Sequence, residues 1–163
     1  MNTPFLDHVY EQVDFDRDLV LKFFTMFSLF EYALKNAGFC YERRGGEAQA
    51  DWEGFAHKIH GQFNPTASAE IHTAVDYMLN NPVKKQVTDQ NALVFIKRFR
   101  PPGMNDTVWL SVLIRGVRNN LFHGAKFRYE RPRDAERIEH SLVILEAWAQ
   151  LHPDVERALR DAQ

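Results

Sequence analysis

The stretch of the chain best suited to chemistry is RNNLFHG, residues 118–124. It contains an arginine (Arg118), a polar neighbour (Asn119) and a histidine (His123) that four residues separate from the arginine. A guanidinium carries a permanent positive charge in a fork that matches phosphate oxygens. An imidazole can donate or accept a proton near neutral pH. Together these side chains suggest chemistry at a phosphate group.

RNNLFHG also has a purely structural interpretation. Arg118 could pair with an acid, and Asn119 and Asn120 could assist the end of a helix. His123 would then be a residue that the helix dipole favours near a C-terminus. Spacing alone does not decide between the two interpretations.

The motif ends a predicted helix that runs through about 107–123. Asn105 or Asp106 can cap its start, and Gly124 stands where a left-handed C-terminal cap is expected. On a helical wheel the apolar residues form one arc that faces the core, and the motif lies on the other side. This inner arc consists of Leu110, Leu113, Ile114, Val117 and Leu121.

Three apolar residues, Val108, Trp109 and Val112, lie on or beside the outward arc of the same helix. Apolar side chains would be wasted on solvent there, so we expect a partner surface. The simplest partner is a second copy of the chain packed by two-fold symmetry.

The remaining pattern is helical and predicts an all-α fold. Apolar residues recur at steps of three and four over 16–36, which is typical of a helix that buries one face. We expect further helices over 51–60, from Ser68 to before Pro82, from Asp134 to about Leu151, and from Pro153. Residues 83–103 are the least certain segment, and Ala92–Phe99 could be a short strand or a helical turn. We see no convincing set of strands, and expect one domain over 1–163, a bundle of about four or five helices.

Composition limits the partners. The net charge of −2 excludes a protein that is basic throughout, so any nucleic-acid site must be local. Such a local site is indicated between 115 and 133, where six basic residues stand against one acid, Glu130.

Cys40 is the single cysteine, and the acidic start lacks the features of a signal peptide. The most apolar segment is interrupted by Lys22 and Glu31, so we expect a cytoplasmic protein without a membrane partner.

Arg118, Asn119 and His123 resemble the signature of the HEPN superfamily, in which an arginine and a polar residue precede a histidine at a helix end. The resemblance extends to FFTMFSLFEYALKNAGF at 23–39, to WLSVLIRGVRNNLFHGAKF at 109–127 and to the all-α outline. It implies a HEPN-like helical bundle that forms a C2 homodimer. Many such proteins are metal-independent endoribonucleases of toxin–antitoxin, antiphage or RNA-processing systems. The catalytic pair would be Arg118 and His123, with Asn119 beside them.

The chemistry of RNA cleavage without a metal agrees with these residue types. The 2′-hydroxyl attacks the phosphate, so a base must take its proton, an acid must protonate the leaving 5′-oxygen, and positive charge must face the phosphorane. One histidine cannot be base and acid at once, whereas two-fold symmetry would bring a second Arg118 and His123 into the same cleft. We expect no metal and no cofactor.

Two sets of supporting residues follow from this interpretation. We expect Glu31, on the apolar helix, to hold Arg118 or to orient His123, because a buried carboxylate needs a partner. The alternative is a surface glutamate at the rim of the helix. The basic residues expected to contact RNA phosphates are Arg115, Lys126, Arg128, Arg131 and Arg133; otherwise they belong to a solvated loop.

Other functions stay open. A catalytically silent HEPN module could bind RNA, a nucleotide or a protein partner, and a plain helical scaffold could use the motif only to stabilise a dimer. An antitoxin or other protein partner is compatible with the resemblance. However, Ala125 stands where toxins silenced by adenylylation often carry a tyrosine. Glu53, His57 and His60 share one helical face, but no further metal ligand is evident.

Overall fold

The structure is a computed structural model that describes residues 4–12, 16–122 and 131–162. Its helices are α1 (Pro4–Gln12), α2 (Arg17–Asn36), α3 (Trp52–Ile59), α4 (Ala69–Asn80), α5 (Asp106–Phe122), α6 (Arg131–Ala149) and α7 (Pro153–Asp161). The helices predicted from periodicity are therefore confirmed, and α1 is an additional one. Within the described ranges, every helix is too short or too polar to cross a bilayer.

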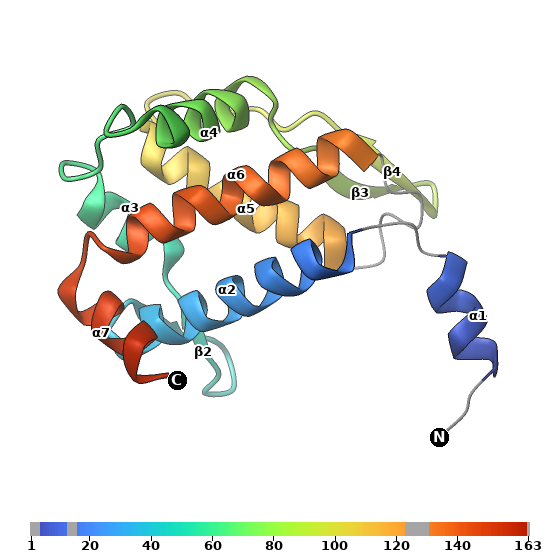
Figure 1. Cartoon of the computed structure of the whole chain (residues 1–163), viewed down its shortest axis with the longest axis horizontal. Coiled ribbons are helices and arrows are strands. Elements are labelled where there is room, and N and C mark those ends of the chain that lie inside the picture. The colour runs from blue at the N-terminus through green and yellow to red at the C-terminus, as the bar shows by residue number, and fades with distance from the viewer. Residues whose placement is uncertain (1–3, 13–15, 123–130, 163) are drawn as a thin grey trace.

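Helices α2 to α7 pack around one aromatic-rich core, with α2 beside α6 and α7, and α5 on the far side of α6 in Figure 1, where α1 stands apart from them. Helices α2 and α4 start on side-chain caps, since Asp16 accepts from the Leu19 amide and Ser68 from the Ile71 amide. Large buried side chains come from α2, α3, α5 and α6, and include Phe23, Phe30, Trp52, Phe55, Leu110, Leu113, Ile114 and Trp148.

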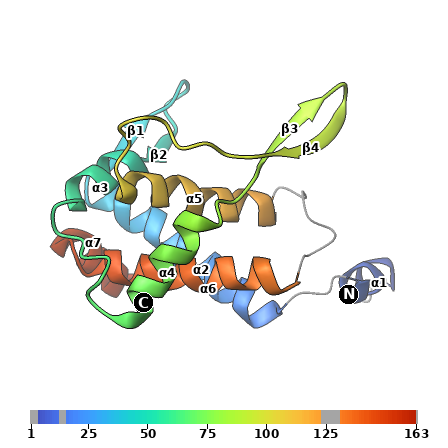
Figure 2. The same cartoon turned by 90° about the horizontal axis from the view of Figure 1, so that it is seen from above.

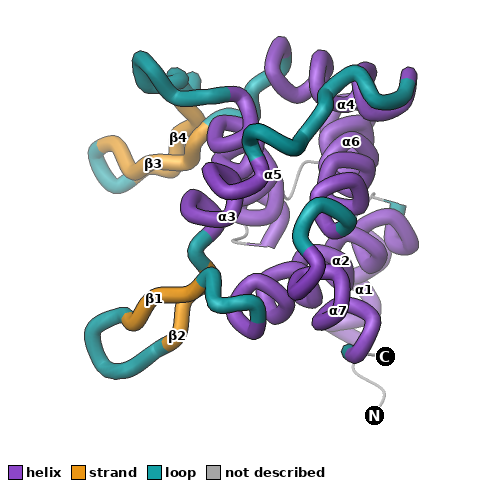
Figure 3. Tube along the Cα trace, turned by 90° about the vertical axis from the view of Figure 1, so that its left-hand side faces the viewer, coloured by secondary structure: helices purple, strands orange, loops and turns teal. Residues whose placement is uncertain are grey.

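Two β-hairpins interrupt the helices, so the expectation of no convincing strands is wrong. In the first, β1 (Cys40–Glu42) pairs antiparallel with β2 (Ala48–Ala50). In the second, β3 (Lys85–Asp89) pairs antiparallel with β4 (Ala92–Ile96) through a turn at Gln90 and Asn91, both of which have positive φ. Both hairpins project from the same side of the helical body (Figures 2 and 3).

The expected partner surface on α5 is also corrected by the structure. Val108 is 1% exposed and Trp109 is 4% exposed, and Val112 is half-buried against the core. The first half of α5 is covered on more than one side because α3 packs against it, with His60 Nδ1 only 3.0 Å from Thr107 Oγ1. These apolar residues therefore belong to the chain's own core. By contrast, the inner arc from Leu110 to Val117 is buried as predicted.

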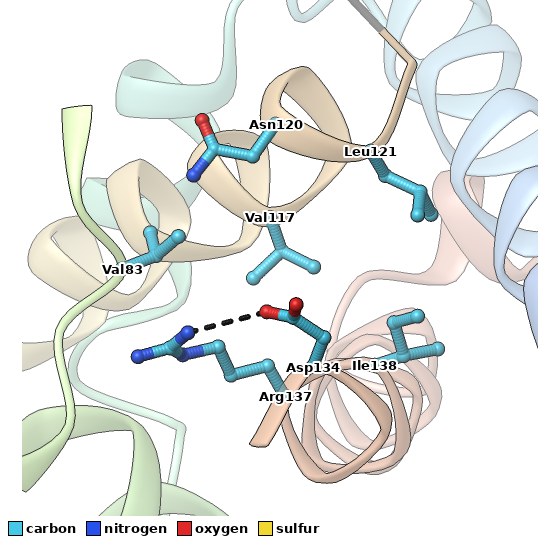
Figure 4. Close-up of a pocket in the computed structure, with 7 residues that line it drawn as sticks. All are labelled: Val83, Val117, Asn120, Leu121, Asp134, Arg137 and Ile138. Carbon is cyan, nitrogen blue, oxygen red and sulfur yellow. Dashed lines mark hydrogen bonds and ion pairs between the residues drawn. The ribbon is translucent and has the colours of Figure 1, made fainter. Parts of the chain in front are cut away.

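The end of α5 meets the start of α6 at a small cavity of about 20 Å³, shown in Figure 4. Its wall contains a buried ion pair in which Arg137 Nη1 lies 3.3 Å from Asp134 Oδ1, with both side chains about one-tenth exposed. The sequence predicts a helix that begins at Asp134, but α6 begins three residues earlier at Arg131. Its carboxylate is therefore available to hold Arg137 beneath Val117 and Asn120.

The Asp134–Arg137 pair gives a stability prediction. Asp134→Leu leaves the Arg137 guanidinium buried without this partner, so we expect the free energy of unfolding to fall by about 3–5 kcal/mol. The double variant Asp134→Leu/Arg137→Met removes both charges and should recover most of that loss. Urea denaturation of the three proteins measures both effects. Equal stability of the single variant and the wild type would contradict the role of the pair.

Candidate functional site

A polar pocket opens where the last turns of α5 face the middle of α2 and the first hairpin. We call it the Arg118 pocket, and its volume is about 520 Å³. That size lies within the range of ligand sites, roughly 300–1,000 Å³. It is lined by Phe27, Glu31 and Lys35 from α2, by Arg43, Glu47, Ala48, Gln49 and Ala50 from the hairpin, and by Arg115, Arg118 and Asn119 from α5.

Positive charge predominates in the Arg118 pocket. Four basic side chains line it against two acidic ones: Lys35, Arg43, Arg115 and Arg118 against Glu31 and Glu47. The basic side chains come from three separate elements, so their convergence is a product of the fold and not of one basic segment. A cluster of this kind favours a ligand with phosphate charge.

Arg118 is positioned by an aromatic stack. Its Cζ lies 5.6 Å from the centroid of the Phe27 ring, within cation–π distance. Phe27 in turn stacks on Trp52 at 5.0 Å, and Trp52 stacks on Phe30 at 5.2 Å. Arg118 Nη1 also donates to Asn119 Oδ1 at 3.2 Å. Arg118 is therefore half-buried at the edge of the core. Its guanidinium packs on the Phe27 ring, which stacks on Trp52.

Glu31 reaches the same pocket from α2 but is bound to another side chain. Trp52 Nε1 donates to Glu31 Oε1 at 2.9 Å. The described hydrogen bond of this carboxylate is thus with the indole and not with Arg118. The other expectation, that Glu31 orients His123, concerns a residue outside the described ranges.

The two asparagines of the motif have different roles. Asn119 is exposed at the pocket, whereas Asn120 is 6% exposed and points away from the pocket, toward Lys84. Asn120 Nδ2 donates to the backbone oxygen of Lys84 at 2.9 Å. This hydrogen bond holds the residue that precedes β3 against α5. Asn120, the second asparagine of RNNLFHG, therefore stabilises the fold and does not line the pocket.

The predicted RNA-contacting residues are placed unevenly. Arg115 is half-buried and lines the Arg118 pocket, and Arg133 is exposed near the start of α6. Arg131 begins α6. His123, Lys126 and Arg128 lie outside the described residues.

Sequence reasoning missed two cations of the pocket, Lys35 and Arg43. Phe27, Glu31 and Lys35 are spaced at i, i+4 and i+8, which predicts one helical face, so Lys35 could have been found. Arg43 depends on the fold of the first hairpin, where its amide bonds the Glu47 oxygen at 2.8 Å.

Of the three residues considered for a metal, two face each other and the third bonds a threonine of α5. His57 Nε2 lies 3.9 Å from Glu53 Oε1, and His60 bonds Thr107. In the part of the chain that the structure describes, no three His, Cys, Asp or Glu side chains are arranged to hold a metal ion.

Comparison of the chain with protein-family models, with curated proteins and with solved structures finds no match. The functional interpretation therefore depends on the geometry and chemistry of the Arg118 pocket.

The Trp52–Glu31 bond leads to a second prediction. Glu31→Ala leaves the buried Trp52 N–H without its acceptor, so the free energy of unfolding should fall by about 1–3 kcal/mol. Glu31→Gln keeps an oxygen acceptor and should lose less. Glu47→Ala is the matched control, because this exposed carboxylate lines the same pocket and its loss should change stability by less than about 0.5 kcal/mol. Thermal or urea unfolding measures all three. If Glu31→Ala and Glu47→Ala have the same effect, the proposed role of the bond is wrong.

Proposed function

We propose that the chain is a metal-independent endoribonuclease that acts as a homodimer through Arg118 and His123. The observation that carries the proposal is the Arg118 pocket, a polar hollow with four basic side chains at the end of the helix that leads into His123. Phosphate is the ligand that such a lining favours, and a backbone with many phosphates would extend across it.

In the proposed reaction the substrate supplies its own nucleophile. The 2′-oxygen forms a bond to phosphorus while the bond from phosphorus to the 5′-oxygen breaks. A base takes the 2′-hydroxyl proton and an acid gives a proton to the 5′-oxygen, and imidazoles are suited to both tasks. Arg118 faces the negative charge that develops on the non-bridging oxygens. The products are a 2′,3′-cyclic phosphate and a 5′-hydroxyl, so DNA is not cut.

A homodimer would supply the second imidazole. Since Val108 and Trp109 are buried within the chain, another surface must form the contact. Helix α2 exposes Leu21 by 61% and Phe24 by 51%, and on the helical wheel both lie next to the face that carries Glu31 and Lys35. A contact through these two side chains would bring the Arg118 pockets of two copies toward each other.

The setting that fits this chemistry and the HEPN resemblance is a cytoplasmic toxin or antiphage effector, restrained by an antitoxin or other protein partner.

The nuclease proposal predicts a specific pattern of loss. Purified wild type should cleave single-stranded or structured RNA in EDTA, and His123→Ala should lower the rate by about 10²–10⁴-fold because one proton transfer is lost. Arg118→Ala should abolish cleavage, and Arg118→Lys should restore only part of it because an ammonium lacks the planar fork. Gel analysis with end-group mapping measures rates and products.

A 2′-deoxyribose at the cleaved position should prevent the reaction in wild type. Cleavage that persists unchanged in Arg118→Ala would refute the proposal. If wild type binds RNA but never cuts it, the chain is instead a silent RNA-binding module.

The dimer contact gives a separate prediction. Phe24→Asp places a charge on the proposed contact, so it should convert a dimer to a monomer and lower cleavage, while the chain stays folded. His72→Asp, at an exposed site on α4, is the control and should leave the dimer intact. Light scattering coupled to size exclusion measures the mass. A wild type that is monomeric at concentrations where it cleaves RNA would contradict the composite site.

A further inference from the structure

The second hairpin, β3–β4, extends from the helical body (Figure 2) and carries unusual exposed side chains. Leu93 is 68% exposed near its tip, and Phe99 is 80% exposed just after β4. A two-stranded hairpin by itself is only marginally stable in water. A large aromatic ring exposed beside such an arm indicates a surface that meets a partner.

The charge of the hairpin indicates which partner. Over residues 83–100 there are five basic residues and one acid, Asp89 at the turn. Arg100 is neutralised by Asp106, with 2.5 Å between Nη1 and Oδ1. The other four are Lys84, just before β3, Lys85, Lys97 and Arg98, and the three lysines are exposed. Phe99 thus lies in the sequence Lys-Arg-Phe-Arg, an aromatic ring among cations.

The base of the hairpin is fixed to the motif helix. Asn120 holds the Lys84 oxygen, and Arg98 Nε donates to the Val83 oxygen at 3.3 Å. A Cβ at Gly116 would lie 2.6 Å from Val83 Cγ1, so glycine is what permits this close approach. The hairpin therefore starts beside the same turns of α5 that present Arg115 and Arg118 to the pocket.

Arg98 brings positive charge from the hairpin to α5 beside the pocket, since a Cβ at Gly116 would lie 3.3 Å from Arg98 Nη2 and the neighbouring residue, Arg115, lines the pocket. Burial, and then repulsion by the charge of Arg115, lower the pKa of Arg98. A phosphate between them would relieve that repulsion. Figure 3 shows the two hairpins on the same side of the body, and α5 carries both Gly116, against which the second hairpin packs, and Arg115, which lines the pocket.

We propose that the β3–β4 hairpin is an RNA-binding arm, in which Lys85, Lys97 and Arg98 contact the phosphates of single-stranded RNA and Phe99 stacks on a base. The RNA strand then continues past Arg115 into the Arg118 pocket. This inference rests on the proposed function in that RNA is the ligand, but it concerns binding and not cleavage. A basic groove with stacking aromatics is the arrangement that holds single strands without sequence choice.

The test is the affinity of the full chain for a fluorescein-labelled oligonucleotide of 2′-O-methyl RNA, which cannot be cleaved by 2′-hydroxyl attack. Fluorescence anisotropy is recorded over a series of salt concentrations. Lys85→Gln/Lys97→Gln removes two phosphate contacts, so the slope of log K against log salt should become shallower by about 1.4. The matched control Lys58→Gln/Arg157→Gln removes the same charge from α3 and α7 and should keep the wild-type slope.

Phe99 is tested in the same assay. Phe99→Ala should weaken binding by about 5- to 100-fold, which is the loss expected for one stacked base. Phe99→Trp keeps a stacking face and should bind as wild type does. Circular dichroism confirms that each variant is folded.

The outcomes separate this inference from the proposed function. Cleavage by wild type together with unchanged RNA binding in the hairpin variants overturns the arm and leaves the nuclease. Hairpin-dependent binding without any cleavage supports the arm and overturns the nuclease. If wild type does not bind RNA at all, or if the two double variants bind alike, the hairpin is not an RNA surface.

Discussion

The stacking of Phe27, Trp52 and Phe30 is the interaction on which the rest of the site depends. Trp52 lies between rings at 5.0 and 5.2 Å and is 2% exposed, so α2 and α3 are fixed to each other at this point. The stack carries Arg118 on the face of Phe27 and gives Glu31 its partner through the indole N–H. Arg118 is thereby held half-buried against Phe27. Its charge attracts an anion more strongly there than it would in open solvent.

Helix α5 connects this stack to the other parts of the molecule. Its first half is buried, and its last turns present Arg115, Arg118 and Asn119 to the pocket while Asn120 and Gly116 receive the second hairpin on the other side. The cations of the two hairpins and of α5 are therefore placed relative to one rigid element. Positioned charge of this kind is what a phosphate-binding site requires, because the groups need not be reordered when the ligand arrives.

Helices could be predicted from the sequence because each buries one face, so apolar residues recur at steps of three and four. Among the described strands, only β4 falls in a segment, Ala92–Phe99, for which the sequence offers a short strand as one of two possibilities. The strands Cys40–Glu42 and Ala48–Ala50 are three residues long, the first wholly exposed and the second running from exposed to buried, so neither shows an alternation. The turn of the second hairpin uses Gln90 and Asn91, which lack the glycine that usually marks such turns. Trp109 was assigned to a dimer contact because a wheel of one helix does not show that α3 covers its second side.

The candidate site could be predicted only in part, for a related reason. Arg118 and Asn119 could be predicted because they belong to one local motif. Arg43 lies 75 residues before Arg118 in the sequence, and the fold of the first hairpin brings it to the same pocket. The roles of Asn120 and Gly116 depend on contacts with 83–98, which no periodicity reports. Local patterns thus identify the residues whose side chains are suited to a given chemistry. Long-range packing decides which of these side chains share a site.

The most direct measurement of the central claim is a crystal structure of the protein with bound 2′-O-methyl RNA. The account predicts a phosphate within hydrogen-bond distance, about 3 Å, of the Arg118 guanidinium, with the His123 imidazoles of two copies near the same phosphate. A complex in which the RNA lies on another face, with Arg118 still packed on Phe27 and no phosphate in its pocket, would contradict it.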